Sequence, residues 1–196
     1  MPRERFARLT AWLRARSPWL LLVVGAGAML VVAGGTAAGL KWTNTEAFCT
    51  ACHEMRDNVY AEFKDTPHDR NASGVRAICS DCHVPREPID MLIRKVRATG
   101  ELYGKLMGII DTPEKFEEHR YAMAKNVWAR MKKTDSRECR HCHTESAMDP
   151  ELQSERAKTR HERAKRENLT CIDCHFGIAH KEPEGPGPQE IDFAGQ

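Results

Sequence analysis

The chain has 196 residues, of which 30 are Lys or Arg and 28 are Asp or Glu, so its formal net charge is +2. This near balance gives no reason to expect a nucleic-acid partner. Aromatic residues make up 7% of the chain and charged residues 30%, which argues against a β-sandwich around a large apolar core. The length allows one membrane segment and one domain.

The first element in chain order is an uncharged segment over residues 19–40. A helix of this length reaches about 33 Å, enough to span a bilayer. Five arginines precede the segment, whereas Lys41 is the single basic residue between the segment and the first cysteine. The positive-inside rule therefore predicts a single-pass membrane protein with residues 1–18 in the cytoplasm and the residues after the segment outside it. A cleaved signal peptide is the alternative, although the apolar segment is longer than is usual for one.

Four copies of the pattern Cys-x-x-Cys-His follow, and they contain all eight cysteines of the chain. This pattern is the attachment site of c-type haem, in which both thiols form thioethers and the histidine can bind the iron. The sequence thus predicts four covalently bound haem c groups. The motif residues are Cys49, Cys52 and His53; Cys79, Cys82 and His83; Cys139, Cys142 and His143; and Cys171, Cys174 and His175.

Paired cysteines have two other common uses in proteins. Zinc sites are also built from Cys-x-x-Cys pairs, but zinc does not require a histidine directly after each second cysteine. Disulfides are the other alternative, yet pairs separated by two residues are more typical of haem or metal sites than of bridges across a core.

Residues 41–180 are predicted to form a mainly α, loop-rich tetrahaem domain in which the haem groups themselves form the core. No strong strand pattern is found. Helices are expected over residues 88–110 and 113–133, the second beginning with a capping box of Asp111 and Glu114. A charged segment covers residues 150–167, and the Pro- and Gly-rich residues 181–196 are predicted to be a flexible tail.

The spacing of the motifs places the first haem near the membrane, because eight residues after Lys41 reach at most about 28 Å. The gap between the second and third motifs is the longest of the three. We therefore expect two haem pairs with a helical insertion between them.

Nine histidines limit the choice of iron ligands. Apart from the four motif histidines and His141 inside the third motif, those available as distal ligands are His68, His119, His161 and His180. Because His180 follows His175 by only five residues, it can serve a neighbouring haem but not the haem of its own motif. His119 can be a ligand or a core residue. Met55, two residues after His53, can be an iron ligand that raises the potential or an ordinary packing residue.

The anchor and the four motifs, with Cys-His-Glu-Met-Arg at the first and Asp-Cys-His-Val-Pro at the second, resemble the NapC/NirT family of membrane-anchored tetrahaem quinol dehydrogenases. The resemblance extends from the anchor to Gly-Ile-Ala-His at residue 180, and includes Ser-Gly-Val-Arg-Ala at residues 73–77 and Asn-Val-Trp-Ala at residues 126–129.

This resemblance implies a ligand set. In relatives such as NrfH, the first iron is bound by the methionine two residues beyond the motif, which corresponds to Met55, rather than by the motif histidine. The other three haems are bis-histidine, with distal ligands corresponding to His68, His161 and His180. His119 is then left over and is expected to pack in the core.

The resemblance also implies a quinol site beside the first haem, formed by a lysine and an acidic residue that correspond to Lys95 and Glu101. Residues six positions apart do not share a face of a continuous helix. We therefore expect the helix to break near Gly100 if both side chains contact one quinol.

The implied activity is oxidation of menaquinol or ubiquinol in the bilayer and electron delivery to a periplasmic reductase, most commonly nitrate reductase. The chain would be a quinol dehydrogenase and not a terminal reductase. Rival interpretations are an electron donor or anchor for a nitrite or other periplasmic reductase, a direct oxyanion reductase, a passive tether and a soluble electron carrier.

Overall fold

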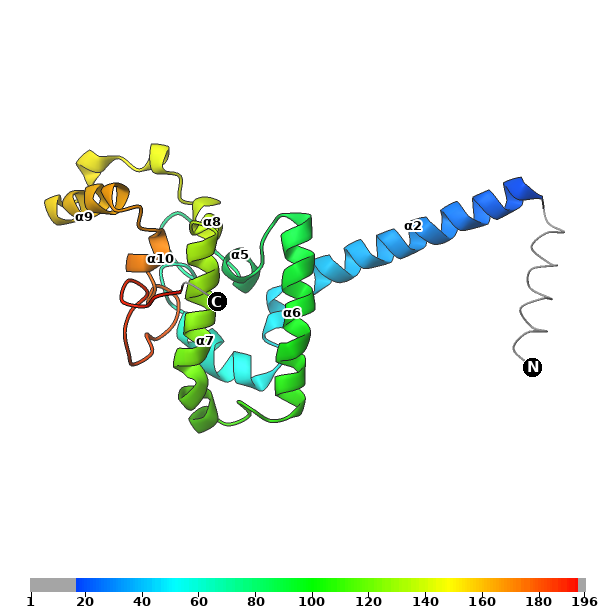
Figure 1. Cartoon of the computed structure of the whole chain (residues 1–196), viewed down its shortest axis with the longest axis horizontal. Coiled ribbons are helices and arrows are strands. Elements are labelled where there is room, and N and C mark those ends of the chain that lie inside the picture. The colour runs from blue at the N-terminus through cyan, green and yellow to red at the C-terminus, as the bar shows by residue number, and fades with distance from the viewer. Residues whose placement is uncertain (1–16, 194–196) are drawn as a thin grey trace. The chain divides into compact units, whose positions relative to one another are not determined.

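The computed structural model describes residues 17–193, which divide into a first unit ending at Thr43 and a second unit beginning at Asn44 (Figure 1). The predicted cytoplasmic segment 1–18 lies outside the described residues except for its last two positions. The first unit is the helix α2, Pro18–Trp42, which contains the predicted segment 19–40. It is long and apolar enough to cross a membrane.

The second unit is built from helices and loops. Residues 17–193 contain no strand, and the mainly α prediction is confirmed. The short helices are α3 Glu46–Cys49, α4 Ala61–Phe63, α5 Cys79–His83, α8 Arg137–Arg140 and α10 Cys171–Cys174, and the longer ones are α6 Pro88–Leu106, α7 Pro113–Lys133 and α9 Glu155–Arg166. A π-helical turn η1 covers Met55–Tyr60, and 3-10 turns cover Glu145–Ala147 (η2) and Pro150–Leu152 (η3).

The ends of α6 and α7 follow from local chemistry. Pro88 begins α6, where its missing N–H costs nothing, and the helix continues through Gly100 to Leu106. The expected break near Gly100 is therefore wrong. The predicted bounds of α7 are correct, but its cap is not Asp111. The Thr112 hydroxyl accepts a hydrogen bond from the Lys115 amide at 3.3 Å.

The apolar core is small. Five hydrophobic side chains are buried among residues 17–193, and three of them, Trp128, Met131 and Ile172, form one cluster between α7 and α10. Phe176 packs edge-on against Trp128 with ring centres 5.4 Å apart. The fully buried hydroxyl of Ser136 accepts a hydrogen bond from the Ile172 amide at 3.1 Å. The cluster thus fixes the fourth motif on α7, and a core this small agrees with haem groups filling much of the interior.

The C-terminal segment differs from the flexible tail predicted for residues 181–196. Up to residue 193 it packs against α7 and the fourth motif, with Pro188 fully buried and Phe193 against the core cluster. The Tyr121 hydroxyl donates to the Pro186 carbonyl at 3.1 Å, and the Lys132 ammonium donates to the Pro188 carbonyl at 2.9 Å. Prolines stiffen this segment, so packing it costs less entropy than the composition suggested.

Candidate functional site

Three motif histidines each face one histidine from outside their own motif. The three ring pairs are His83 with His180, His143 with His68, and His175 with His161, and the ring centres are 6.1, 6.1 and 6.2 Å apart, respectively. His180 therefore lies beside the second motif and not beside His175.

The spacing of these pairs has a direct chemical meaning. An imidazole nitrogen binds a metal at about 2 Å and lies about 1.1 Å from its ring centre, so two imidazoles on opposite sides of one ion have centres about 6 Å apart. Each pair therefore fits one iron ion between its rings. Within residues 17–193 no group of three or more His, Cys, Asp or Glu side chains could hold a metal, whereas a structural zinc site requires four ligands.

Hydrogen bonds orient two of the distal rings. The Nδ1 atom of His180 lies 3.1 Å from the Val59 carbonyl, and Nδ1 of His161 lies 2.7 Å from the Gln153 side-chain oxygen. A histidine that donates from Nδ1 presents a bare Nε2 to a metal. The sequence analysis identified neither partner. Val59 acts through its backbone carbonyl, which any residue type provides, and Gln153 belongs to no recognisable motif.

The electrostatic setting keeps several of these rings neutral. Burial lowers the pKa of His83 to about 3, and burial also lowers the pKa of His175 and of His180. A neutral imidazole is the form that binds a metal. These histidines are thus ready to act as ligands at neutral pH.

Contacts between cysteines place the motifs in the order of the sequence. The Cys49 thiol is within hydrogen-bonding reach of Cys79, and the Cys139 thiol is within reach of Cys171. α3 packs against α5, and α5 packs against α8, so the second motif lies between the first and the third. These cysteines would therefore hold haem groups of successive motifs as neighbours.

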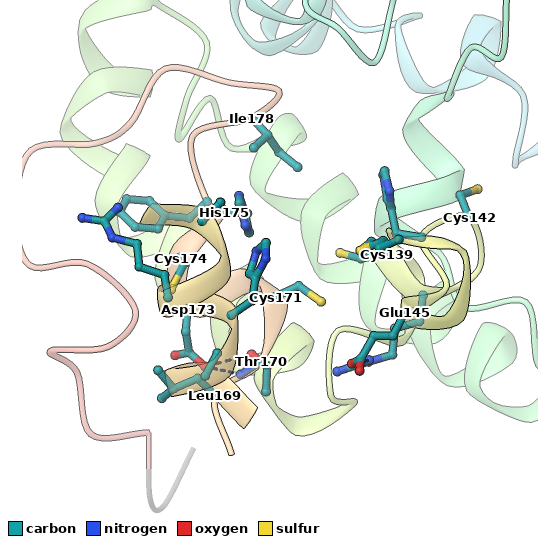
Figure 2. A pocket seen from close by; sticks show the side chains of 18 of the residues that line it. Cys139, Cys142, Glu145, Leu169, Thr170, Cys171, Asp173, Cys174, His175 and Ile178 are labelled. Carbon is teal, nitrogen blue, oxygen red and sulfur yellow. Dashed lines mark hydrogen bonds and ion pairs between the residues drawn. The ribbon is translucent and has the colours of Figure 1, made fainter. Parts of the chain in front are cut away.

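The third and fourth motifs share one cavity of about 2340 Å³. Its lining includes Cys139, Cys142, Cys171, Cys174, and the ring pairs of His143 and His175. Figure 2 shows Cys139 and Cys171 projecting toward the same space from facing helices. The cavity carries the donor set for two haem groups and is large enough for both.

Two aspartates that the sequence analysis did not single out hold the second and fourth motifs in shape. Asp81 accepts from the Ile78 amide at 2.9 Å, and Asp173 accepts from the Thr170 amide at 2.8 Å. The Lys132 ammonium pairs with the buried Asp173 carboxylate at 2.8 Å. The signal was present in the sequence, because both motifs read Cys-x-Asp-Cys-His and place the carboxylate at the third residue of a short helix.

The first motif differs from the other three. Among the described residues no second imidazole faces His53, and Met55 begins the π-helical turn with 39% of its surface exposed. Glu54, which is 3% exposed, pairs with the Lys105 ammonium, and His53 Nε2 lies 3.5 Å from the same carboxylate. Burial works to raise the pKa of Glu54, but the Lys105 hydrogen bond contributes to a net lowering. A charged lysine–glutamate pair therefore lies beside the first motif.

Lys95 and Glu101 do not converge. In the continuous helix α6 they are about 120° apart around the axis. Lys95 lies close enough to Cys49 to interact electrostatically, and burial lowers its pKa. Glu101 instead pairs with Arg94 at 2.8 Å, on another side of the helix. The polar pair near the first motif is Lys105 with Glu54, which the sequence analysis did not identify.

The two remaining histidines stand apart from the ring pairs. His119 is exposed on α7, where Nδ1 lies 2.9 Å from the Lys115 carbonyl. The expectation that it packs in the core is wrong, because its face of α7 turns to solvent at that position. His141 lies 3.8 Å from the Glu87 carboxylate.

Comparison with known proteins agrees with these features. A profile of the NapC/NirT cytochrome c family, N-terminal region, matches residues 13–185. The denitrification system component NirT of Stutzerimonas stutzeri is 52% identical over 172 residues, which are 88% of this chain and 86% of that protein. The cytochrome c-type protein NapC of Escherichia coli K12 is 50% identical over 180 residues, 90% of each chain.

A putative tetraheme cytochrome-c type protein of Allochromatium vinosum is 49% identical over 148 residues, 76% of this chain and 80% of that one. No solved structure matches the chain. The chain therefore belongs to the NapC/NirT cytochrome c family, and it is a membrane-anchored cytochrome with four covalently bound haem c groups that takes part in quinol-linked electron transfer.

Proposed function

We propose that the chain oxidises menaquinol or ubiquinol beside the first motif and delivers the electrons to a periplasmic terminal reductase, with nitrate reductase as the first candidate. The observation that carries the proposal is the contrast between the motifs. Three motif histidines face a second imidazole, whereas His53 lies beside an ion pair on the side of α6. An iron with two histidine ligands is six-coordinate, which suits electron transfer. An iron at the first motif, with a polar ion pair beside it and no second histidine, suits contact with a substrate.

The ligand assignment follows the ring pairs. His83 and His180 hold the second iron, His143 and His68 the third, and His175 and His161 the fourth. Met55 or His53 holds the first. When bound, haem c takes up and releases one electron at a time, so it can accept the two electrons of a quinol in turn.

The polar residues of the first centre bind and orient the quinol. Oxidation to the quinone breaks two O–H bonds and releases two protons and two electrons. Lys95 and Lys105 lie about 80° apart on α6, so both can face the first motif. We assign the contact with the quinol oxygen to Lys95, and we assign to Glu54–Lys105 the role that the resemblance gave to Glu101.

The topology follows from charge. Five arginines precede the anchor, and this supports a topology with the N-terminus in the cytoplasm and residues 41–180 in the periplasm. The motif order leaves the fourth haem farthest along the chain of contacts from the first. A nitrite or other periplasmic reductase is the alternative partner, and a direct oxyanion reductase is disfavoured because the three ring pairs leave no second open centre among residues 17–193.

Replacing His161 by methionine tests the ligand assignment. The fourth haem should remain attached through its cysteines, and one of the four midpoint potentials should rise by about 100 mV or more, because a thioether ligand favours the reduced iron. Potentiometric titration of the purified protein measures this. His119→Met is the matched control and should leave all four potentials unchanged. A rise with His119→Met, or none with His161→Met, contradicts the assignment.

Anaerobic reduction by menaquinol, and separately by ubiquinol, tests the quinol site. With the detergent-solubilised protein, Glu54→Gln should slow the quinol-driven change in the haem absorption bands about 10-fold or more, as expected for loss of a positioning contact worth about 1.4 kcal/mol or more. Glu101→Ala should slow it far less. If Glu101→Ala has the larger effect, the site lies on the other side of α6. No reduction by either quinol, with all haems reducible by dithionite, contradicts quinol oxidation altogether.

A further inference from the structure

Helix α6 carries an apolar stripe that the rest of the described chain does not cover. Its members are between 47% and 85% exposed, and they are Ile89, Leu92, Ile93, Val96, Tyr103 and Leu106. At 3.6 residues per turn they occupy one arc of about 140° along the whole helix. Exposed apolar surface of this extent marks an interaction site.

The stripe points away from the contacts that α6 makes within its own unit. Asp90 accepts from Arg137 at 2.8 Å, Asn44 donates to the Met91 sulfur at 3.7 Å, and Lys105 pairs with Glu54. On the helical wheel the α6 members of these contacts lie roughly opposite the stripe. The contacts that α6 makes with Arg137, Asn44 and Glu54 are therefore on the other side of the helix from the stripe.

Only a short stretch of chain separates the end of the membrane anchor from a residue that contacts α6. Asn44, which is hydrogen bonded to Met91, follows the last residue of α2, Trp42, by only two positions. Two residues span about 7 Å at most. A helix held by such a short connection to the end of a membrane anchor is within reach of the bilayer surface.

We propose that the apolar stripe of α6 lies in the interfacial layer of the lipid bilayer, so that the helix is a second membrane attachment beside the anchor. The composition fits a helix lying in the membrane plane. The stripe is apolar except for Thr99 near its middle, and the basic side chain of Arg97 borders it on the edge away from Lys95. An arginine at this border extends its guanidinium group toward anionic lipid headgroups.

Lipid photolabelling of the full chain tests the proposal. The protein, with all four haem groups, is placed in vesicles of phosphatidylethanolamine and phosphatidylglycerol that carry a carbene-generating label on the acyl chain. Adducts are then located by mass spectrometry. Helix α9, which is polar and exposed on the same unit, is the internal control. We expect labelling of the α6 peptide severalfold above that of α9.

The variant Val96→Gln with Leu106→Gln sharpens the test. Both side chains are exposed, so the haem spectrum should be unchanged while α6 labelling falls. Labelling of α6 no greater than that of α9 overturns the proposal. The proposal is also overturned if α6 is protected from labelling and cross-links form between copies of the chain but disappear on dilution. That result assigns the stripe to contact with a second copy.

The readout is independent of quinol oxidation. Strong labelling of α6 in a protein that no quinol reduces would contradict the proposed function and leave the membrane contact standing. Conversely, a quinol-active protein without α6 labelling would contradict only the membrane contact. If both hold, the double variant should raise the KM for a long-chain quinol in vesicles and leave kcat for a short-chain, water-soluble quinol unchanged.

Discussion

Replacing Arg120 by glutamine should cost about 3–5 kcal/mol of unfolding free energy, because it leaves a largely buried carboxylate without its partner. The Arg120 guanidinium is 8% exposed and binds both oxygens of Glu62, at 3.0 and 2.5 Å. The same Glu62 carboxylate accepts from the Lys181 amide at 3.0 Å, directly after His180. Denaturant unfolding of the holoprotein measures the loss.

The same variant has a spectroscopic signature that a purely structural residue would lack. Because Arg120 and Glu62 hold the backbone next to His180, the variant should loosen the His83–His180 pair and convert part of one low-spin haem signal to high spin. Electron paramagnetic resonance measures this. The matched control is Arg70→Gln, which removes an exposed ion pair with Asp65 and should cost about 1 kcal/mol or less. Equal effects of the two variants would contradict the positioning role.

Replacing Cys139 and Cys142 together by serine should give a protein with three haem groups and a loss of stability beyond about 4 kcal/mol. The cavity of about 2340 Å³ is lined by the cysteines of the third and fourth motifs, so the two attached haem groups would fill much of it. Without one of its two haem groups the cavity either admits water or collapses. Mass spectrometry counts the haem groups, and thermal unfolding measures the stability.

A functional consequence separates this variant from simple destabilisation. The third motif lies between the second and fourth in the chain of contacts, so quinol should still reduce part of the haem while delivery to an external acceptor stops. The control is Ser80→Ala, a change within the second motif that removes no iron ligand. It should retain both the reduction by quinol and the delivery of electrons to the external acceptor. Full delivery by the three-haem protein would contradict the proposed order of the motifs.

Features that depend on neighbouring residues alone were predicted best from the sequence. Short patterns predicted the four haem motifs, the anchor and the bounds of α7, because these patterns do not depend on distant residues. The distal histidines were narrowed to four candidates by counting. Which candidate faces which motif depends on the path of loops, and no pattern in the sequence encodes it; His68 and His143 are far apart in the chain but lie 6.1 Å apart as rings.

Four expectations differ from the structure, for different physical reasons. Asp111 was expected to cap α7, but the adjacent Thr112 does so because its extended backbone aims the hydroxyl at the Lys115 amide. His119 and the C-terminal segment were misplaced because helical periodicity and composition do not report which surface tertiary packing covers. Gly100 did not break α6, since a single glycine costs only about 1 kcal/mol in a helix.

The contacts between cysteines of different motifs constrain how the protein is made. In the folded chain Cys49 lies against Cys79 and Cys139 against Cys171, so a chain that folded with free thiols in an oxidising compartment would favour disulfides between motifs. Such bridges would block haem attachment at two motifs at once. We therefore expect each motif to receive its haem before the motifs come together in the folded chain.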